Sequence, residues 1–402
     1  MHLTKLEITR FRCHAGVRMS IPDAGVRIVG PNGSGKTSIL EAIGMLATTR
    51  SFRGANDRDV VNWESGRDFG VAPFTRVEAT VRSNGDETRL GIVLELTDDG
   101  ESVQSKRFLV DDSPTSAHDL VGNLMVVAFT PEDVQLVIGP PADRRRAIDI
   151  LISQVDRTYM RRLTAYGRVL RQRNGLLKAF ARDRVQPDAA MAIAQISFWD
   201  EQLVAEGGYL IARRARVAAA LDGAMALHAA AMSERGRYGL DYAPRVRVDQ
   251  AALLAAEEPL EHAVIRANEA FRQDLEAHRE DEFRRGMTLT GPHRDDLVFT
   301  VEGRSLARFG SRGEQRLGVL AMKLAEADVI ADVSGDTPVF LLDDVLSELD
   351  PTHRAMLLDQ LAARRAQTIL TSAEEAALDH PALESLSVFR TDTASTEHSS
   401  QT

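Results

Sequence analysis

Cysteine and long apolar runs are scarce in this chain of 402 residues, and both absences exclude classes of protein. The one cysteine, Cys13, cannot form an internal disulfide or a cysteine-rich zinc site, which excludes a disulfide-stabilised secreted scaffold and a zinc finger. No stretch approaches the roughly 18 uninterrupted apolar residues of a membrane span, and residues 1–7 lack the apolar run of a secretory signal. We therefore expect a cytoplasmic protein with no membrane partner.

Positive charge is also in deficit overall, because the chain carries −10 at pH 7, which argues against a histone-like partner. Segment 143–184 is the exception. It contains 12 basic and four acidic residues, so the remaining chain carries −18. This local excess indicates a polyanionic partner, or it is the solvated face of a helix in a chain whose cations are nearly all arginine. The sequence leaves both interpretations open.

The pattern of apolar residues divides the chain into a β-rich start, a helical middle and an α/β end. Residues 1–140 contain alternating or β-branched runs and one clear helix, 37–49. Residues 141–286 are rich in Ala, Leu, Arg and Glu without a sustained heptad, which predicts a compact helical arm. Residues 287–390 return to an α/β pattern, and the polar tail 391–402 is expected to be disordered. The strands expected after residue 240 are 245–248, 287–290, 297–301, 338–342 and 367–370.

A phosphate-binding loop is the clearest motif. Every fixed position of G-x-x-x-x-G-K-[ST] is matched by Gly30, Pro31, Asn32, Gly33, Ser34, Gly35, Lys36 and Thr37. The segment follows a predicted strand and precedes a predicted helix, so its backbone N–H groups can surround a phosphate. Lys36 is expected to neutralise the β- and γ-phosphates and the Thr37 hydroxyl to bind Mg²⁺. A plain glycine-rich turn is the alternative, but the complete match predicts binding of a nucleoside triphosphate.

An apolar run that ends in two carboxylates, Val339 to Asp344, is typical of a Walker B strand. Its uninterrupted apolar character predicts a strand covered on both faces of a parallel sheet. Asp343 is expected to act as a Mg²⁺ ligand, directly or through water, and Asp344 to orient the attacking water or accept its proton. The run is weak evidence alone, but together with the phosphate loop it makes Lys36, Asp343 and Asp344 candidate catalytic residues.

A third motif, Ser311-Arg312-Gly313-Glu314-Gln315, is similar to the signature sequence of ABC-type ATPases. Ser311, Gly313 and Gln315 are candidate nucleotide contacts, and Ser311 is also a candidate catalytic residue, because a hydroxyl at a helix N-terminus forms an anion site. The chain already has one phosphate loop, so this second site is expected to face the nucleotide of another copy. That arrangement predicts an ATP-dependent homodimer. The alternative is a capping box between Ser311 and Glu314.

The order of these motifs, completed by the D-loop-like stretch from Leu346 to Asp350, predicts an ABC/SMC-type P-loop ATPase head with mixed β-sheets and helices, carrying an inserted α-helical arm. The chain resembles the RecF family of bacterial DNA-repair ATPases, which is related to the SMC proteins. The matching stretches are Phe11-Arg12, Gly30–Thr37, Arg50–Arg53, Phe129–Asp133, Arg144–Asp149, Gly291–Leu297, Ser311–Gln315 and Asp343–Asp350.

The resemblance implies an ATP- and Mg²⁺-dependent protein that binds DNA at junctions between a single-strand gap and duplex. It also implies that the protein acts with RecO and RecR to help RecA load, and that it is a weak, DNA-stimulated ATPase. Asp344 stands where transporter ATPases carry a longer Glu, so we expect slow hydrolysis. Thr371 and its neighbours stand where transporters carry a switch His, which leaves the γ-phosphate sensor unassigned.

Two other functions are weighed against this one. The first is the ATPase subunit of another ABC-type system, either a transporter or another SMC-like DNA ATPase. The insertion of about 270 residues between the phosphate loop and the signature argues against a transporter. The second is an adaptor with a structural nucleotide, which the intact Lys36, Asp343 and Asp344 argue against. His293 and Arg294 are either a polar loop beside nucleotide or DNA, or a turn between strands. The residues expected to pack rather than to act in a site are Cys13, Trp63 and Trp199.

Overall fold

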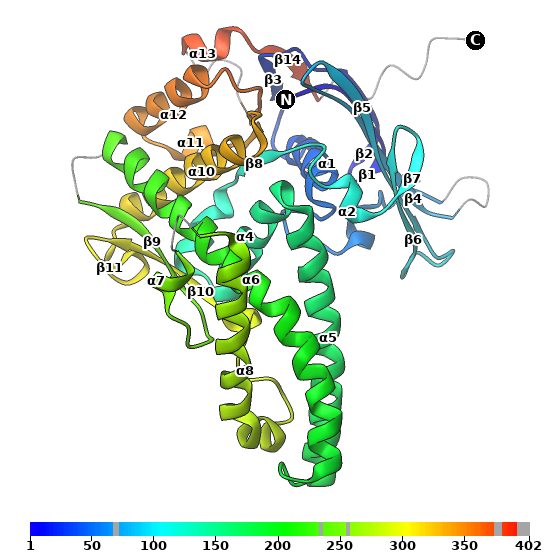
Figure 1. The fold of residues 1–402 in the computed structure, drawn as a ribbon. Helices are drawn as coiled ribbons and strands as arrows, with labels where there is room; N and C mark the ends of the chain where they lie inside the picture. The colour runs from blue at the N-terminus through cyan, green and yellow to red at the C-terminus, as the bar shows by residue number, and fades with distance from the viewer. Residues whose placement is uncertain (67–71, 233–235, 255–257, 374–379, 392–402) are drawn as a thin grey trace. The chain divides into compact units, whose positions relative to one another are not determined.

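The chain divides into two compact units in the computed structural model (Figure 1). Unit 1 is formed by Met1–Asp133 together with Glu326–Thr402, and unit 2 by Val134–Ala325. In the described part of the chain, no helix combines the length and the hydropathy needed to cross a lipid bilayer. The residues that the structure describes are 1–66, 72–232, 236–254, 258–373 and 380–391.

These units differ from the expected domains chiefly after residue 286. Residues 287–325, which the sequence groups with the head, lie in unit 2. They do so because β10 (Asp296–Val301) pairs in antiparallel register with β9 (Tyr238–Ala243), a strand from the predicted arm. The predicted disordered tail, 391–402, lies outside the described residues except for Thr391.

Unit 1 contains two β-sheets with helix α1 (Lys36–Thr48) packed between them. The antiparallel sheet has the order β2-β1-β4-β5-β6-β7 and the parallel sheet the order β14-β3-β13-β12-β8. The first consists of β1 (His2–Phe11), β2 (His14–Ser20), β4 (Phe74–Ser83), β5 (Asp86–Leu96), β6 (Val103–Val110) and β7 (Ser113–Thr115). The second consists of β3 (Gly25–Val29), β8 (Val126–Phe129), β12 (Val339–Asp343), β13 (Thr368–Ser372) and β14 (Ser387–Arg390). The short helices are η1 (Asp57–Val60), α2 (Ala117–Leu120), η2 (Pro131–Val134), α11 (Val345–Glu348), α12 (Pro351–Ala363) and α13 (Pro381–Glu384).

The sequence explains why α1 and β12 occupy the centre of unit 1. Eleven of the 13 residues of helix α1 are buried, and Ile39, Leu40 and Ile43 are fully buried between the sheets. All five residues of β12 are buried, as the continuous apolar run predicts. The parallel strands therefore end along one edge of their sheet, where the loop that follows β3 leads into α1.

Unit 2 is built on three long helices that run beside one another (Figure 1). Helices α5 (Arg157–Asp183) and α8 (Leu260–Arg285) both pack against α6 (Ala190–Met232), which at 43 residues is about 65 Å long. The strands β9, β10 and β11 (Arg304–Ser305) form an antiparallel sheet. The other helices are α3 (Gln135–Ile138), α4 (Pro141–Val155), α7 (Gln250–Leu253), η3 (Pro292–Arg294), α9 (Leu306–Phe309) and the first part of α10 (Arg312–Ser334), whose residues from Glu326 onward belong to unit 1.

Two predicted strands are wrong. The strand expected at 245–248 lies earlier, as β9, and 287–290 forms no strand. In 287–290 the backbone and hydroxyl groups bond to side chains instead of to a neighbouring strand. Asn174 Oδ1 accepts from the backbone of Thr288 at 2.8 Å, and Glu282 Oε1 accepts from the backbone of Leu289 at 2.7 Å. The β-branched pattern of this segment therefore reflects burial, not strand pairing.

The expectation that Cys13 and Trp63 pack in the interior is also wrong. Trp63 is 77% exposed and Cys13 is exposed. Val60 and Val61, which precede the indole, supply the buried surface at this point of unit 1. Trp199 is half-buried and meets the ring of Phe198 edge-on.

Candidate nucleotide-binding site

The phosphate loop connects β3 to α1, and its backbone requires glycine at two positions. Gly33 and Gly35 have φ values of 84° and 91°, a region that other residues rarely adopt. The Nζ of Lys36 donates to the carbonyl oxygens of Gly30 at 2.7 Å and Pro31 at 3.0 Å. The ammonium group is thus held against the loop by two backbone acceptors.

Two residues distant in the sequence hold this loop from either side. His14 Nε2 lies 3.0 Å from the carbonyl oxygen of Gly35, and burial lowers the pKa of His14, which keeps the imidazole neutral. The Oγ1 of Thr391 donates to Ser34 Oγ at 2.7 Å, and its backbone N–H donates to Val29 at 3.1 Å. A Cβ added at Gly35 would lie 2.4 Å from His14 Nε2, so the packing also requires glycine there.

Cys13 lies on the same side of the loop. A Cβ added at Gly35 would also come within 2.4 Å of its Sγ. The thiol therefore adjoins the phosphate loop. Nothing in the local sequence indicates this contact, because it brings the turn between β1 and β2 beside a loop more than 20 residues further along the chain.

Asp343 and Thr37, both predicted as metal ligands, are brought together at the carboxyl edge of the parallel sheet. Asp343 Oδ1 accepts from Thr37 Oγ1 at 2.8 Å and from Thr371 Oγ1 at 3.0 Å. Burial raises the pKa of Asp343, and these two hydrogen bonds oppose the increase. The charge of Glu132, which follows β8 on the same edge, raises the pKa further.

These donors fit Mg²⁺. In the segments that the structure describes, no group of three or more His, Cys, Asp and Glu side chains is placed to hold a metal. Mg²⁺ commonly takes one or two carboxylates and completes its shell with phosphate oxygens and water. A buried carboxylate hydrogen-bonded to the hydroxyl of Thr37 is such a partial set, since the ion would relieve the cost of burying the charge of Asp343.

Asp344 has an unusual backbone that separates it from Asp343. Its φ and ψ are 52° and 16°, and its backbone N–H donates to Thr371 Oγ1 at 2.9 Å. Asp tolerates this left-handed region better than most residues. The Asp344 carboxylate makes no hydrogen bond within the described residues and is partly exposed, so it is available to a water molecule.

Helix α1 also carries a buried acid that joins two of the stretches on which the resemblance to the RecF family rests. Glu41 is fully buried and accepts from Arg12 at 2.6 and 2.9 Å and from Ser51 Oγ at 2.5 Å. Arg53 approaches the same carboxylate at 3.9 Å. The stretches Phe11-Arg12 and Arg50–Arg53 therefore converge on Glu41, a connection that the sequence analysis missed.

The signature-like segment lies in unit 2 and forms a capping box at the start of α10. The backbone N–H and the Oγ of Ser311 donate to Glu314 Oε2 at 2.7 and 2.8 Å, and the backbone N–H of Glu314 donates back at 3.3 Å. Gln315 Nε2 donates to the carbonyl oxygen of Gly310 at 3.2 Å. Ser311 and Gly313 are exposed. The alternative weighed for this motif is thus present, and it occupies the Ser311 hydroxyl.

The stretch Gly291–Leu297 is a buried polar centre of unit 2. Arg214, which is 2% exposed, donates to the carbonyl oxygen of Pro292 at 2.6 Å and to Asp295 Oδ2 at 3.0 Å. The Tyr166 hydroxyl lies 2.6 Å from His293 Nδ1, and burial lowers the pKa of His293 to about 4. His293 and Arg294 lie in the short helix η3, which precedes β10 but follows no strand, so they do not form a turn between two strands.

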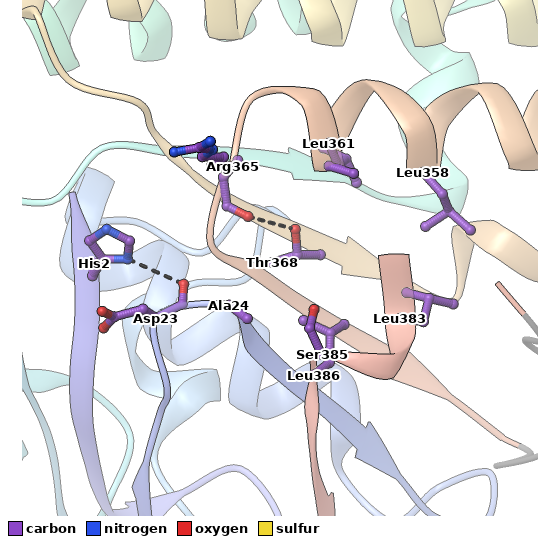
Figure 2. Close-up of a pocket in the computed structure, with 12 residues that line it drawn as sticks. His2, Asp23, Ala24, Leu358, Leu361, Arg365, Thr368, Leu383, Ser385 and Leu386 are labelled. Carbon is purple, nitrogen blue, oxygen red and sulfur yellow. Dashed lines mark hydrogen bonds between the residues drawn. The ribbon is translucent and has the colours of Figure 1, made fainter. Parts of the chain in front are cut away.

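A separate cavity of about 480 Å³ lies at the opposite, amino edge of the parallel sheet (Figure 2). It is lined by His2 and Asp23 and, mostly, by apolar side chains such as Leu361, Leu383 and Leu386. Ala24 and Thr368, also in its wall, stand where β3 and β13 begin. The phosphate loop follows the other end of β3, so this cavity is not the nucleotide site.

A glycine-rich loop between strand and helix, with a carboxylate at the end of a nearby parallel strand, defines the class of P-loop α/β proteins. Residues 2–396 match the model of a protein family that is described as the RecF/RecN/SMC N terminal domain. The protein named DNA replication and repair protein RecF from Thermomicrobium roseum is 43% identical over 393 residues, which cover 97% of this chain and 98% of that protein. The protein of the same name from Chloroflexus aggregans is 42% identical over 377 residues, which cover 92% of this chain and 93% of that protein. The chain therefore belongs to the RecF family.

Solved structures support the fold. The structure described as that of the recombination mediator protein RecF-ATPrS in the RecFOR pathway has a TM-score of 0.80 at 24% identity and covers 94% of both chains. The predicted fold class, an ABC/SMC-type head with an inserted helical arm, is confirmed by this similarity.

Proposed function

We propose that this protein is an ATP-dependent DNA-binding protein of recombinational repair and replication maintenance. In this proposal ATP joins two copies, the dimer holds DNA at a junction of gap and duplex, and slow, DNA-stimulated hydrolysis releases it. Relatives at 42–43% identity are named DNA replication and repair proteins, and solved neighbours are described as RecF with ATP or ATPrS in the RecFOR pathway. We further propose that it acts in the cytoplasm with RecO- and RecR-like mediators to help RecA load.

The observation that carries the ATPase part is the hydrogen bond between Thr37 and Asp343. It places the end of β12 beside the phosphate loop, 306 residues away in the sequence. Mg²⁺, when bound by these two side chains, supplies positive charge to the phosphate oxygens. Lys36 would exchange its backbone acceptors for phosphate oxygens, and Asp344 would orient a water molecule or accept its proton. The short side chain of Asp344 positions that water less closely than Glu would, which is the physical reason to expect slow turnover.

The dimer part depends on the exposed N-terminus of α10. Ser311 and Gly313 of one copy would contact the triphosphate bound by the other copy, since both residues are exposed. The Ser311 hydroxyl donates to Glu314, so it must leave that carboxylate before it can donate to a phosphate. In this proposal the capping box is the state of the single copy, and the triphosphate of a second copy replaces Glu314 as the acceptor.

Light scattering of the purified protein, with and without ATP and with gapped DNA, tests the proposal. We expect the mass of one copy without nucleotide, a doubled mass with ATP, and a larger complex when gapped DNA is added. A transporter subunit would dimerise without responding to DNA, and an adaptor would bind ATP without releasing phosphate. A mass that ATP leaves unchanged would contradict the proposed dimer.

A further inference from the structure

The exposed cations of α5 lie in one line. The helix contains eight basic residues and a single acid, Asp183. Positions 157, 161, 164, 168, 171, 175, 178 and 182 are separated alternately by four and three residues. Six of the eight basic residues occupy these positions, and Thr164 and Gly175 occupy the other two. This spacing places them within an arc of about 100° on one face, over a length of about 37 Å. All six are exposed, and they are Arg157, Arg161, Arg168, Arg171, Lys178 and Arg182. We call this set the α5 stripe.

Other cations of the basic segment have structural roles. Arg144 Nε donates to Asp296 at 2.7 Å, and Arg145 donates to the carbonyl oxygen of Asp295 at 2.6 Å. Arg173 is 1% exposed and donates to Asp200 and to Glu282, both at 2.7 Å. The positive charge that remains available to a ligand is therefore concentrated in the α5 stripe.

Most of the stripe is not neutralised by the protein. Within the described ranges, the side chains of Arg157, Arg168, Arg171 and Lys178 form no ion pair and no hydrogen bond. Arg182 pairs with an acid of its own helix, Asp183, at 2.8 Å. The neighbouring helix α8 has no such excess of positive charge, because it contains seven acids and five arginines.

The chemistry of the stripe favours a phosphate backbone over a protein surface or single-stranded nucleic acid. Among the described residues of α5, no large apolar side chain is exposed. Protein interfaces need buried apolar or aromatic anchors, and single-stranded nucleic acid is usually held by aromatic side chains that stack on its bases. The phosphates of duplex DNA, by contrast, are bound chiefly by Lys and Arg and need no aromatic anchor. The small residues Thr164 and Gly175 let a backbone approach closely.

We propose that the α5 stripe binds the sugar-phosphate backbone of duplex DNA over about one helical turn, which is about 34 Å long, without reading sequence. This inference rests on the proposed function and adds to it. It assigns the duplex side of a gap junction to α5 and leaves the single strand to other parts of the protein.

Salt titration of DNA binding tests the assignment on the full chain with ATP. The stripe variant combines R168Q, R171Q and K178Q. The control variant combines R279Q, R284Q and R285Q, which removes three charges from α8 of the same helical group. With a blunt duplex, we expect the stripe variant to reduce the slope of log affinity against log salt by about 2.7 and to weaken binding at least about tenfold. The control slope and the affinity for a single strand should stay within about twofold of the parent.

Each outcome is decisive. Equal salt slopes in the stripe and control variants would overturn the assignment. The partner of the stripe would then be an acidic protein surface instead of DNA. An equal loss of duplex and single-strand binding would overturn the restriction to duplex. If the parent protein bound no DNA at all, the proposed function would fail first. Far-ultraviolet circular dichroism of the variants should match the parent, because all six replaced side chains lie on the surface or near it.

Discussion

Lys36 is the residue on which nucleotide affinity should depend most. Its ammonium group donates to two backbone carbonyls of the loop, and charge-assisted bonds of this kind contribute about 1.5–3 kcal/mol each. Lys36→Met should therefore weaken ATP binding roughly tenfold or more while the fold is kept. Equilibrium binding of a fluorescent ATP analogue measures this. Lys5→Met, at an exposed position of β1, is the control and should bind as the parent does.

Asp344 should separate nucleotide binding from hydrolysis. Asp344→Asn keeps the size of the side chain and its tolerance of the left-handed backbone but removes the proton acceptor. Turnover should fall about 100-fold or more, as for loss of a general base, and the ATP-bound dimer should accumulate on DNA. Phosphate release and light scattering on the same sample measure both effects. Normal turnover would remove Asp344 from this role.

His293 should make unfolding depend on pH. Its pKa is about 4 in the folded chain, below the ordinary value of 6.5, because the ring is buried and lies near the positive charge of Arg294. The unfolded chain therefore binds the extra proton first, so this group costs stability as pH falls below about 6.5. Between pH 7 and 5 the loss from His293 should reach about 2 kcal/mol. Urea unfolding at both pH values should show a smaller loss in His293→Gln; an identical loss would contradict the burial of a neutral imidazole.

At the scale of the elements, α5 has one face that packs against other helices and one face that is exposed. Two arginines only two positions apart in the sequence, Arg173 and Arg171, lie on these different faces. Arg173 pairs with Asp200 of α6 and Glu282 of α8, whereas Arg171 has no partner among the described residues. Arg173→Met leaves two buried carboxylates unpaired and should lower the free energy of unfolding by about 3–5 kcal/mol. Arg171→Met should change it by less than about 0.5 kcal/mol. Denaturant titration of the two variants side by side makes the comparison, and equal stabilities would contradict the ion-pair assignment.

The elements that sequence could predict are those whose pattern is local. The phosphate loop, α1, β12 and α10 follow from glycine spacing and apolar periodicity within a single segment. The strand at 287–290 failed because buried side chains, not a neighbouring strand, satisfy its backbone. The candidate site is predictable only where its residues belong to a motif. Thr37 and Asp343 do, whereas His14 and Thr391 do not. Their roles arise from contacts between distant segments, which no local pattern encodes.

At the scale of the whole molecule, each proposed ATP site combines the phosphate loop of one copy with the signature-like segment of another. Lys36→Met disables the first and Ser311→Arg the second, so neither variant alone should dimerise with ATP. A mixture of the two restores one complete site per pair, namely the loop of the Ser311→Arg copy with the signature of the Lys36→Met copy. Light scattering should then show dimers in the mixture only, at equal total protein. A mixture that stays monomeric would indicate that Ser311 has no role across the interface.

The neighbours of β3 in the parallel sheet determine when the phosphate loop can take its shape. Strand β3 pairs with β13 and β14, and the loop that follows β3 is bound by Thr391. During synthesis, β3 must therefore wait for more than 300 further residues before either neighbouring strand exists. Unit 2 is complete by Ala325, so its helices can fold on the ribosome while β3 is still unpaired. We therefore expect the nucleotide pocket to be the last part of the protein to mature, and a chain still under synthesis to bind no triphosphate.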